Sequence, residues 1–488
     1  MTPLVLLAFV LGYFLLLLLV AWRTSRRADD ASFFIGNRRS HWLLVAFGMV
    51  GTSLSGVTFV SVPGTVAASG FTYLQIVLGH VLGYAIVAFV LLPLYYRLGL
   101  TSIYRYLGDR FGAVSHRTGA GFFIVSRTLG ATARLYLVVR VLQDLVLDRL
   151  GIPFWLSAAV IVLMILLYTY EGGVKTIVWT DTLQTAGMLT GLLVCVGYLL
   201  ALREQTPWQA LAQMQEAGTA RLWGTDPLAR DFWVKQVLAG IFIAVAMTGL
   251  DQEMMQKNIS VARLRDAQKN MLLMSLVLLA VVALFLFLGG LLAQLGPTLG
   301  LPAGGDRLFP AVVLGHLPDW VQLLFVLALI SALFPSADGA LTALTASTCI
   351  DLLRLPQRAD LGEAARTRRR KQVHLAYAVL FLALVLVFRA VDDPSMVVLI
   401  LKLAGYTYGP LLGLFAFGLL SRRRPREGWV PVVALAAPAL CALIDWQQAR
   451  WLGGYQIGLE LLLINAGFTA AGLWLASSPT RQPPPGTT

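Results

Sequence analysis

The feature that most constrains this chain is its succession of apolar runs, each long enough to cross a lipid bilayer. A spanning helix needs roughly 20 mainly apolar residues. By that length the chain offers about 13 runs, at 3–22, 41–66, 73–96, 119–147, 153–170, 178–202, 231–256, 269–296, 318–351, 373–391, 396–421, 427–446 and 456–477. Only 13% of the residues are charged, about half the share of a soluble domain. Because lipid cannot satisfy backbone hydrogen bonds, we expect an all-α polytopic membrane protein.

The basic residues indicate how these helices are oriented. If the N-terminus lies outside, the predicted inner connections hold 26 lysines and arginines and the outer connections hold 7. Because cytoplasmic loops carry such an excess, we predict a multi-pass protein of the cell (inner) membrane with its N-terminus outside and its C-terminus in the cytoplasm. The basic run Arg366 to Lys371 is then expected to fix topology rather than to bind nucleic acid. The run 3–22 lacks a basic segment before it and a cleavage site after it, so we predict a retained helix.

One apolar run contains a stretch that favours a broken helix. Residues 51–64 read GTSLSGVTFVSVPG, with three glycines, one proline and five hydroxyl residues: Thr52, Ser53, Ser55, Thr58 and Ser61. A broken spanning helix lined by hydroxyls is typical of the ion and substrate site of a secondary transporter. The alternative is a small-residue face that packs against a neighbouring helix.

Ionisable residues inside the apolar runs suggest further functional positions, because charge is costly within a membrane. Asp181, Asp251 and Asp338 lie in three such runs, and the basic candidates are Arg127, Arg134 and Lys402. Asp338 shares one helix face with Thr342 and Thr345, at i, i+4 and i+7. Hard cations prefer such oxygen ligands. Structural salt bridges for Asp181 and Asp251, and local back-bonding for the threonines, are the alternatives.

Other functional classes fit the sequence less well. An enzyme would need a catalytic cluster, but the five histidines are scattered and no HExxH or GxSxG motif occurs. A channel would need a filter or a pore ring, and none is visible. The three cysteines lie in apolar runs without metal-site spacing. The chain therefore reads as a transporter rather than an enzyme.

Three motifs together resemble the sodium/solute symporter family: GGVKTIVWTDTLQ at 172–184, TGLDQEMMQKNIS at 248–260, and the long segment 331–351 that ends in STCID. The resemblance implies a leucine-transporter-type fold with two inverted five-helix repeats. The expected divisions are an extra helix and cytoplasmic loop at 1–40, the first repeat at 41–202, an extracellular loop at 203–230, the second repeat at 231–421, and two further helices with a short tail at 422–488.

The resemblance also implies a sodium site between the first and eighth core helices. On this chain its positions are Gly51 and Leu54, facing Ala332, Pro335 and Ser336. Pro335 departs from the family, which usually has a hydroxyl residue there, so one ligand is lost.

Some members of the family bind a second cation, and here the matching residues are Asp181 and Asp338. Two carboxylates could also share a proton, which keeps a proton-coupled variant open.

The predicted solute site is most similar to that of the sialic-acid-transporting branch. Its hydroxyls would be Ser53, Ser55 and Thr58, and Arg134 would clamp a carboxylate, with Arg127 as second choice. We therefore expect Na⁺-coupled import, by alternating access, of a small polar solute, possible examples being sugar acids such as sialic acid. A neutral sugar or an amino acid is the alternative. The expected partners are the solute, sodium and membrane lipid, with no nucleic acid and no obligate protein partner.

Overall fold

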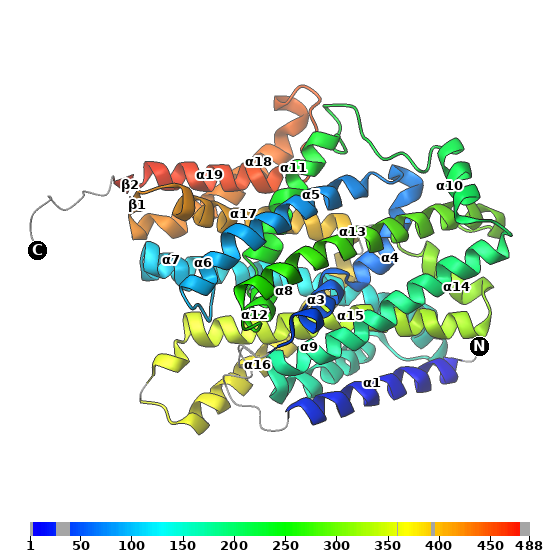
Figure 1. Cartoon of the computed structure of the whole chain (residues 1–488), viewed down its shortest axis with the longest axis horizontal. Coiled ribbons are helices and arrows are strands. Elements are labelled where there is room, and N and C mark those ends of the chain that lie inside the picture. Colours follow the sequence, from blue (N-terminus) through cyan, green and yellow to red (C-terminus); the bar gives the residue numbers. More distant parts are fainter. Residues whose placement is uncertain (1–2, 26–39, 359, 392–395, 479–488) are drawn as a thin grey trace, which may run out of the picture.

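The computed structural model describes residues 3–25, 40–358, 360–391 and 396–478, which form a bundle of long helices (Figure 1). Helix α1 (Pro3–Ser25) lies along one edge of this bundle, and α19 (Leu461–Leu475) lies along the opposite edge. α1 begins at one end of the long axis and α19 ends at the other (Figure 1). Most of the first predicted inner connection, 26–39, and the tail, 479–488, fall outside the described residues.

The remaining helices follow one another through short connections. They are α3 (Trp42–Ser53), α4 (Gly56–Ser69), α5 (Tyr73–Ile86), α6 (Leu92–Arg97), α7 (Arg105–Arg110), α8 (Ala113–Leu142), α9 (Phe154–Leu202), α10 (Pro207–Glu216), α11 (Trp233–Ala244), α12 (Gln252–Ile259), α13 (Leu264–Leu295), α14 (Leu308–His316), α15 (Asp319–Ser347), α16 (Glu363–Val391), α17 (Met396–Leu420) and α18 (Val430–Trp451). Two short strands, β1 (Arg424–Pro425) and β2 (Ser477–Ser478), pair antiparallel.

The predicted apolar runs coincide with these helices. Within the described residues, nine helices are long and apolar enough to cross a membrane, and two bent pairs, α3–α4 and α11–α12, pass the same test together. Phe154–Tyr170 and Leu461–Leu475 are shorter apolar helices. The predicted runs 153–170 and 178–202 both lie in α9. The all-α membrane fold is confirmed, whereas the number of spans and the repeat boundaries stay predictions.

The break predicted at 51–64 is present, and a second break lies in the predicted run 231–256. α3 and α4 are bent by 54° where Leu54 and Ser55 interrupt the helix. The second break follows α11, where a π-helical turn (Val245–Gly249) leads into α12 at an angle of 66°. In each case a run that reads as one span by its apolarity is divided by residues that leave the helical conformation.

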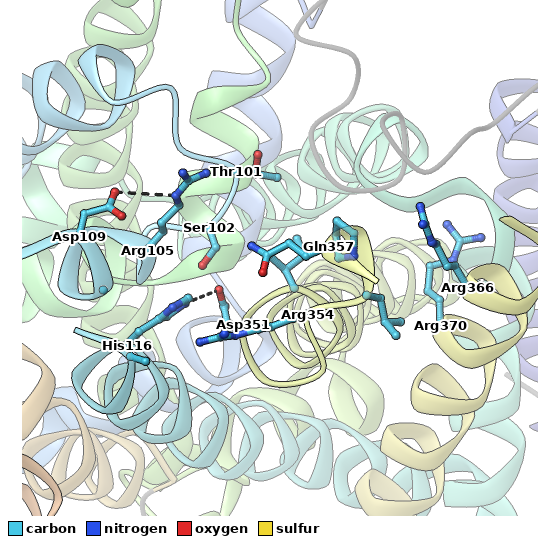
Figure 2. A pocket seen from close by; sticks show the side chains of 15 residues that line it. Thr101, Ser102, Arg105, Asp109, His116, Asp351, Arg354, Gln357, Arg366 and Arg370 are labelled. Carbon is cyan, nitrogen blue, oxygen red and sulfur yellow. Dashed lines mark hydrogen bonds and ion pairs between the residues drawn. The ribbon is translucent and has the colours of Figure 1, made fainter. Parts of the chain in front are cut away.

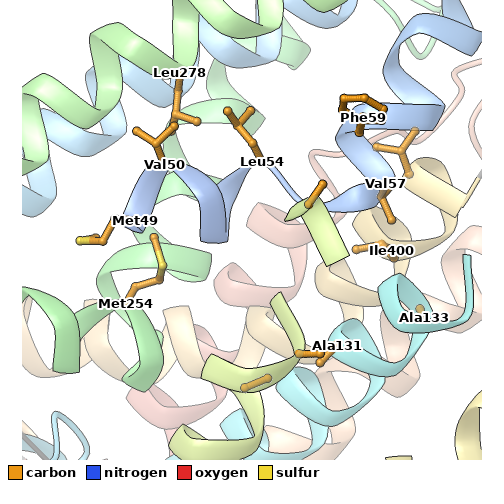
Figure 3. Close-up of a cluster of buried hydrophobic side chains, with 14 of the residues drawn as sticks. Met49, Val50, Leu54, Val57, Phe59, Ala131, Ala133, Met254, Leu278 and Ile400 are labelled. Carbon is orange, nitrogen blue, oxygen red and sulfur yellow. The ribbon is translucent and has the colours of Figure 1, made fainter. Parts of the chain in front are cut away.

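Helix α15 lies in the core and positions the site. It packs against α9, α8 and α3, and 76% of its most apolar window is buried, compared with 22% for α1. Apolar side chains also fix the first break: Val50 and Leu54 lie on the side that faces Leu278 of α13 (Figure 3). Close packing of this kind holds two half-helices in one geometry, because a packed interior has few alternative arrangements.

Candidate functional site

The first break is held against α9 by close backbone approach. A Cβ atom at Gly51 would lie 2.2 Å from Thr185 Oγ1, so only glycine fits there without displacing α9. After Gly51 the helix ends at Ser53, and α4 begins after Ser55. The Ser55 side chain makes no capping bond to the first turn of α4. The break therefore leaves polar groups at membrane depth that the helix itself does not satisfy.

A cavity of about 110 Å³ lies where the two breaks meet. The first break contributes Ser53, Ser55 and Thr58, and the second contributes Thr248. The remaining polar lining comprises Thr52, Tyr73, His80, Tyr84, Arg127 and Arg134. The structure thus brings together all four residues predicted to bind solute, Ser53, Ser55, Thr58 and Arg134, although no solute is present to test their role.

The two arginines that line this cavity are in different situations. Arg127 forms an ion pair with Glu253 and lies 3.8 Å from Asp251 Oδ2. Arg134, two turns further along α8, has no hydrogen bond or ion pair with any residue that the structure describes. Arg134 is partly buried and lines the cavity, and among the described residues its guanidinium, unlike that of Arg127, has no carboxylate at ion-pair distance.

At the second break, Asp251 caps the start of α12. Asp251 is the N-cap residue of α12, and its Oδ1 accepts hydrogen bonds from the backbone N–H groups of Glu253 and Met254. Its other oxygen accepts the hydroxyl of Tyr408 at 2.7 Å. Asp251 therefore satisfies the amides that a broken helix exposes, which supports the structural alternative for this residue.

A lysine that the sequence places in an inner loop lies instead inside the protein. Lys257 Nζ donates to Asp181 Oδ2 at 2.7 Å and to Thr52 Oγ1 at 2.6 Å. It also lies 3.3 Å from Glu253 Oε1. The Lys257 ammonium thus joins α12 to both α9 and the first break. Asp181, predicted as a cation ligand, already has a resident cation on one oxygen, whereas its Oδ1 has no partner among the described residues.

Asp338 is the other residue, besides Asp181, that we predict to bind a second cation. It is fully buried, and its Oδ2 accepts the hydroxyl of Tyr168 at 2.8 Å. The buried network holds four carboxylates but only two cations paired with them: Asp181, Asp251, Glu253 and Asp338 against Lys257 and Arg127. Carboxylates still outnumber cations when Arg134 is included. Such an imbalance at membrane depth favours uptake of a cation or a proton.

The residues predicted to bind sodium lie on two helices in contact, α3 and α15. Leu54, Ala332 and Ser336 are buried, and a Cβ at Gly56 would lie 3.9 Å from the carbonyl oxygen of Ala332. Pro335 lies inside α15 and has no N–H, so it leaves a carbonyl of the preceding turn without its helical partner. Backbone and hydroxyl oxygens of this kind suit sodium, but the ligand set stays a prediction.

A larger cavity of about 330 Å³ adjoins the first and shares Tyr73, Val397 and Leu401 with it. Its rim carries Arg230 and Lys402, and Lys402 Nζ lies 2.9 Å from Asp445 Oδ2. The larger cavity is bordered by the connections that the charge distribution places outside. The two cavities therefore adjoin one another between these connections and the helix breaks.

Sequence reasoning missed Lys257 and Glu253. Their signal was the i, i+4 spacing of opposite charges just after the second break, which places both on one helix face. Lys257 was counted among loop residues because apolar windows end near it.

Comparison with known proteins gives the relatives of this chain. The sequence model described as the sodium:solute symporter family matches residues 33–431. The human sodium/iodide cotransporter is 28% identical over 84% of this chain and 65% of its own length. The human sodium-coupled monocarboxylate transporter 1 is 25% identical over 82% of this chain and 66% of its own. This chain therefore spans just under two thirds of the length of these two relatives.

Solved structures share the fold. A Na⁺-coupled sialic acid symporter, in a substrate-bound outward-open state, superposes with a TM-score of 0.82 at 20% identity, over 97% of this chain and 99% of the other. A transporter of the nucleobase-cation-symport-1 family gives a TM-score of 0.59 at 12% identity, over 91% of this chain and 94% of the other. At these identities the likeness concerns the fold alone.

Proposed function

Because this chain belongs to the sodium:solute symporter family, we propose that it is a secondary active transporter that uses the inward sodium gradient to import a small anionic organic solute. Membership in this family implies Na⁺ as the coupling ion. The observation that carries the proposal for the solute is the cavity at the two helix breaks, where Arg134, which has no ion pair with a described residue, lies beside Ser53, Ser55 and Thr58.

An anion is favoured over a neutral solute by the electrostatics of this cavity. Arg134 is the cation there that no described carboxylate neutralises, and a guanidinium binds a carboxylate through two parallel hydrogen bonds. Relatives named for iodide and for monocarboxylates, and a structural neighbour named for sialic acid, also act on anions. A sugar acid such as sialic acid remains the preferred candidate within this class.

Sodium would bind between the first break and α15, at the carbonyl oxygens of Gly51 and Leu54 and at Ala332, Pro335 and Ser336. The excess of buried carboxylates supports a second cation, or a proton, near Asp181 and Asp338. Because sodium and solute would both contact residues 51–58 at alternating positions, each ligand would stabilise the conformation that binds the other. Such linkage is reciprocal in free energy.

Uptake into proteoliposomes tests the proposal. We expect an inward sodium gradient to drive accumulation of radiolabelled sialic acid or of a short monocarboxylate, whereas galactose and proline stay near the background; accumulation of iodide alone would contradict an organic solute. Ser336→Ala should weaken activation by sodium. Accumulation driven equally by a proton gradient without sodium would favour the proton-coupled alternative. Uptake indifferent to sodium, protons and voltage would reject secondary transport.

A further inference from the structure

A third cavity, of about 750 Å³, shares no lining residue with the cavity at the helix breaks (Figure 2). Its walls are α7, the start of α8, the end of α15 with the turn that follows it, and the first two turns of α16. The basic connections in this region are those that the charge distribution assigns to the cytoplasm. The cavity is therefore separate from the proposed solute site and opens toward the predicted inner side.

Cations outnumber carboxylates in the wall of this cavity. Four arginines, Arg105, Arg354, Arg366 and Arg370, line it together with His116. Its two aspartates already have partners. Asp109 lies 3.7 Å from Arg105. Asp351 accepts hydrogen bonds from Ser347 at 2.7 Å and contacts His116 Nε2 at 2.9 Å (Figure 2). Among the described residues, neither aspartate lies at ion-pair distance from Arg354 or Arg366.

The three remaining arginines are positioned by the fold. Arg354 has a left-handed backbone, with φ at 51°, which is uncommon for a residue other than glycine. Its side chain has no hydrogen bond or ion pair with any described residue. Arg366 donates to the carbonyl of Arg358 at 2.6 Å. Arg370 is only 6% exposed. These side chains are thus held in a wall rather than spread into solvent.

The orientation of the protein in the membrane does not by itself require these arginines to line a cavity. Arg368 and Arg369, on the same first turns of α16, are exposed, as expected for residues that only fix orientation. Arg354, Arg366 and Arg370 instead converge on one cavity from two separate elements. Arg354 and Arg366 carry like charges beside this shared space, and an anion between them would reduce their repulsion.

We propose that this cavity binds a phosphate-bearing anion. The planar guanidinium fork matches phosphate geometry and binds it bidentately. Thr101, Ser102 and Gln357 add neutral donors to the same wall. The phosphate comes either from an anionic lipid headgroup or from a soluble phosphate compound, since both present the same chemistry. Either ligand would connect α7 and α8 with the α15–α16 connection and stabilise the folded protein by mass action.

Thermal unfolding of the purified full chain tests this proposal without any transport substrate. The soluble arm adds inorganic phosphate to protein in neutral detergent, with sulfate-free buffer and chloride at matched ionic strength. The lipid arm compares nanodiscs of phosphatidylcholine with nanodiscs that also contain phosphatidylglycerol. Stabilisation by phosphate assigns the site to a soluble anion, and stabilisation by phosphatidylglycerol alone assigns it to a headgroup. No stabilisation in either arm overturns the proposal.

Three variants locate the effect. Arg354→Gln with Arg366→Gln should raise the half-saturating ligand concentration about tenfold or more, because charge-assisted hydrogen bonds are lost. Arg354→Lys keeps the positive charge but lacks the guanidinium fork. Its half-saturating ligand concentration should therefore lie between those of the wild type and the double variant. Arg369→Gln, on the exposed side of the same helix, should match wild type. An equal effect of Arg369→Gln and of the double variant would overturn the proposal, since general surface charge would then explain the binding.

Discussion

The two helix breaks differ in how the backbone amides exposed at each break are capped. At α11–α12 the exposed amides are capped by Asp251, whose carboxylate also binds Tyr408 and lies near Arg127. At α3–α4 the corresponding cap residue, Ser55, makes no such bond. Among the described residues, the second break has a side-chain cap and the first break lacks one. The comparison indicates that the second break is chiefly a structural joint, whereas the first is open to a ligand.

Lys257 connects the two breaks. It belongs to α12 but binds Thr52 of α3 and Asp181 of α9. A change at the first break can therefore be transmitted to the second through one ammonium group. This contact gives the proposed coupling a physical route, because the half-helices on the same side of both breaks share a hydrogen-bonded network.

The largest loss of stability is expected at the second break, between α11 and α12. Asp251→Ala removes a helix cap, worth about 1 kcal/mol, and leaves the buried Arg127 with fewer partners, so we expect destabilisation of about 3–5 kcal/mol in total. Thermal unfolding in detergent measures it. Asp226→Ala, in an exposed outer turn, is the matched control. Equal unfolding temperatures for the two variants would contradict the structural role of Asp251.

A somewhat smaller effect is expected where Lys257 joins the breaks. Lys257→Met leaves Asp181 charged without its cation, and breaking a buried pair costs about 3 kcal/mol or more. Combining it with Asp181→Asn should restore much of the loss, because both charges are then gone. The double-mutant cycle measures this coupling by unfolding. Additive losses would show that the two side chains do not depend on each other.

These contacts also show what the sequence could and could not predict. Glycine, proline and hydroxyl residues located the first break, and apolar length located the helices, because these signals are local. The partners of the buried charges are not local: Lys257 meets Asp181 across 76 positions, and Tyr168 meets Asp338 across 170. The preference for Arg134 over Arg127 was stated from resemblance, and the structure adds that Glu253 occupies Arg127.

The arginine that remains gives the third prediction, which concerns binding rather than stability. Arg134→Gln should raise the half-saturating concentration of an acidic solute about tenfold or more, because a charge-assisted hydrogen bond is lost. A neutral solute should be affected far less. Arg117→Gln, exposed on the same helix, is the control for uptake assays. An equal loss for acidic and neutral solutes would indicate damage to the cavity instead.

The smallest effect on stability is expected at the open break. Ser55→Ala removes a hydroxyl that caps nothing, so we expect a change within about 0.5 kcal/mol, together with weaker solute binding. Thr206→Ala is the comparison, because Thr206 forms a complete capping box at the start of α10 and should cost about 1 kcal/mol. A larger loss of stability for Ser55→Ala than for Thr206→Ala would mean that the Ser55 hydroxyl also caps the first break.

The most direct test of the central claim is the affinity of the purified protein for an acidic solute, measured with sodium and with choline in its place. If the open break binds both ligands, removal of sodium should weaken solute binding about tenfold, within the usual range of coupling between sites, and Ser336→Ala should reduce this ratio toward one. Equal affinity of the wild-type protein in sodium and in choline would contradict the account.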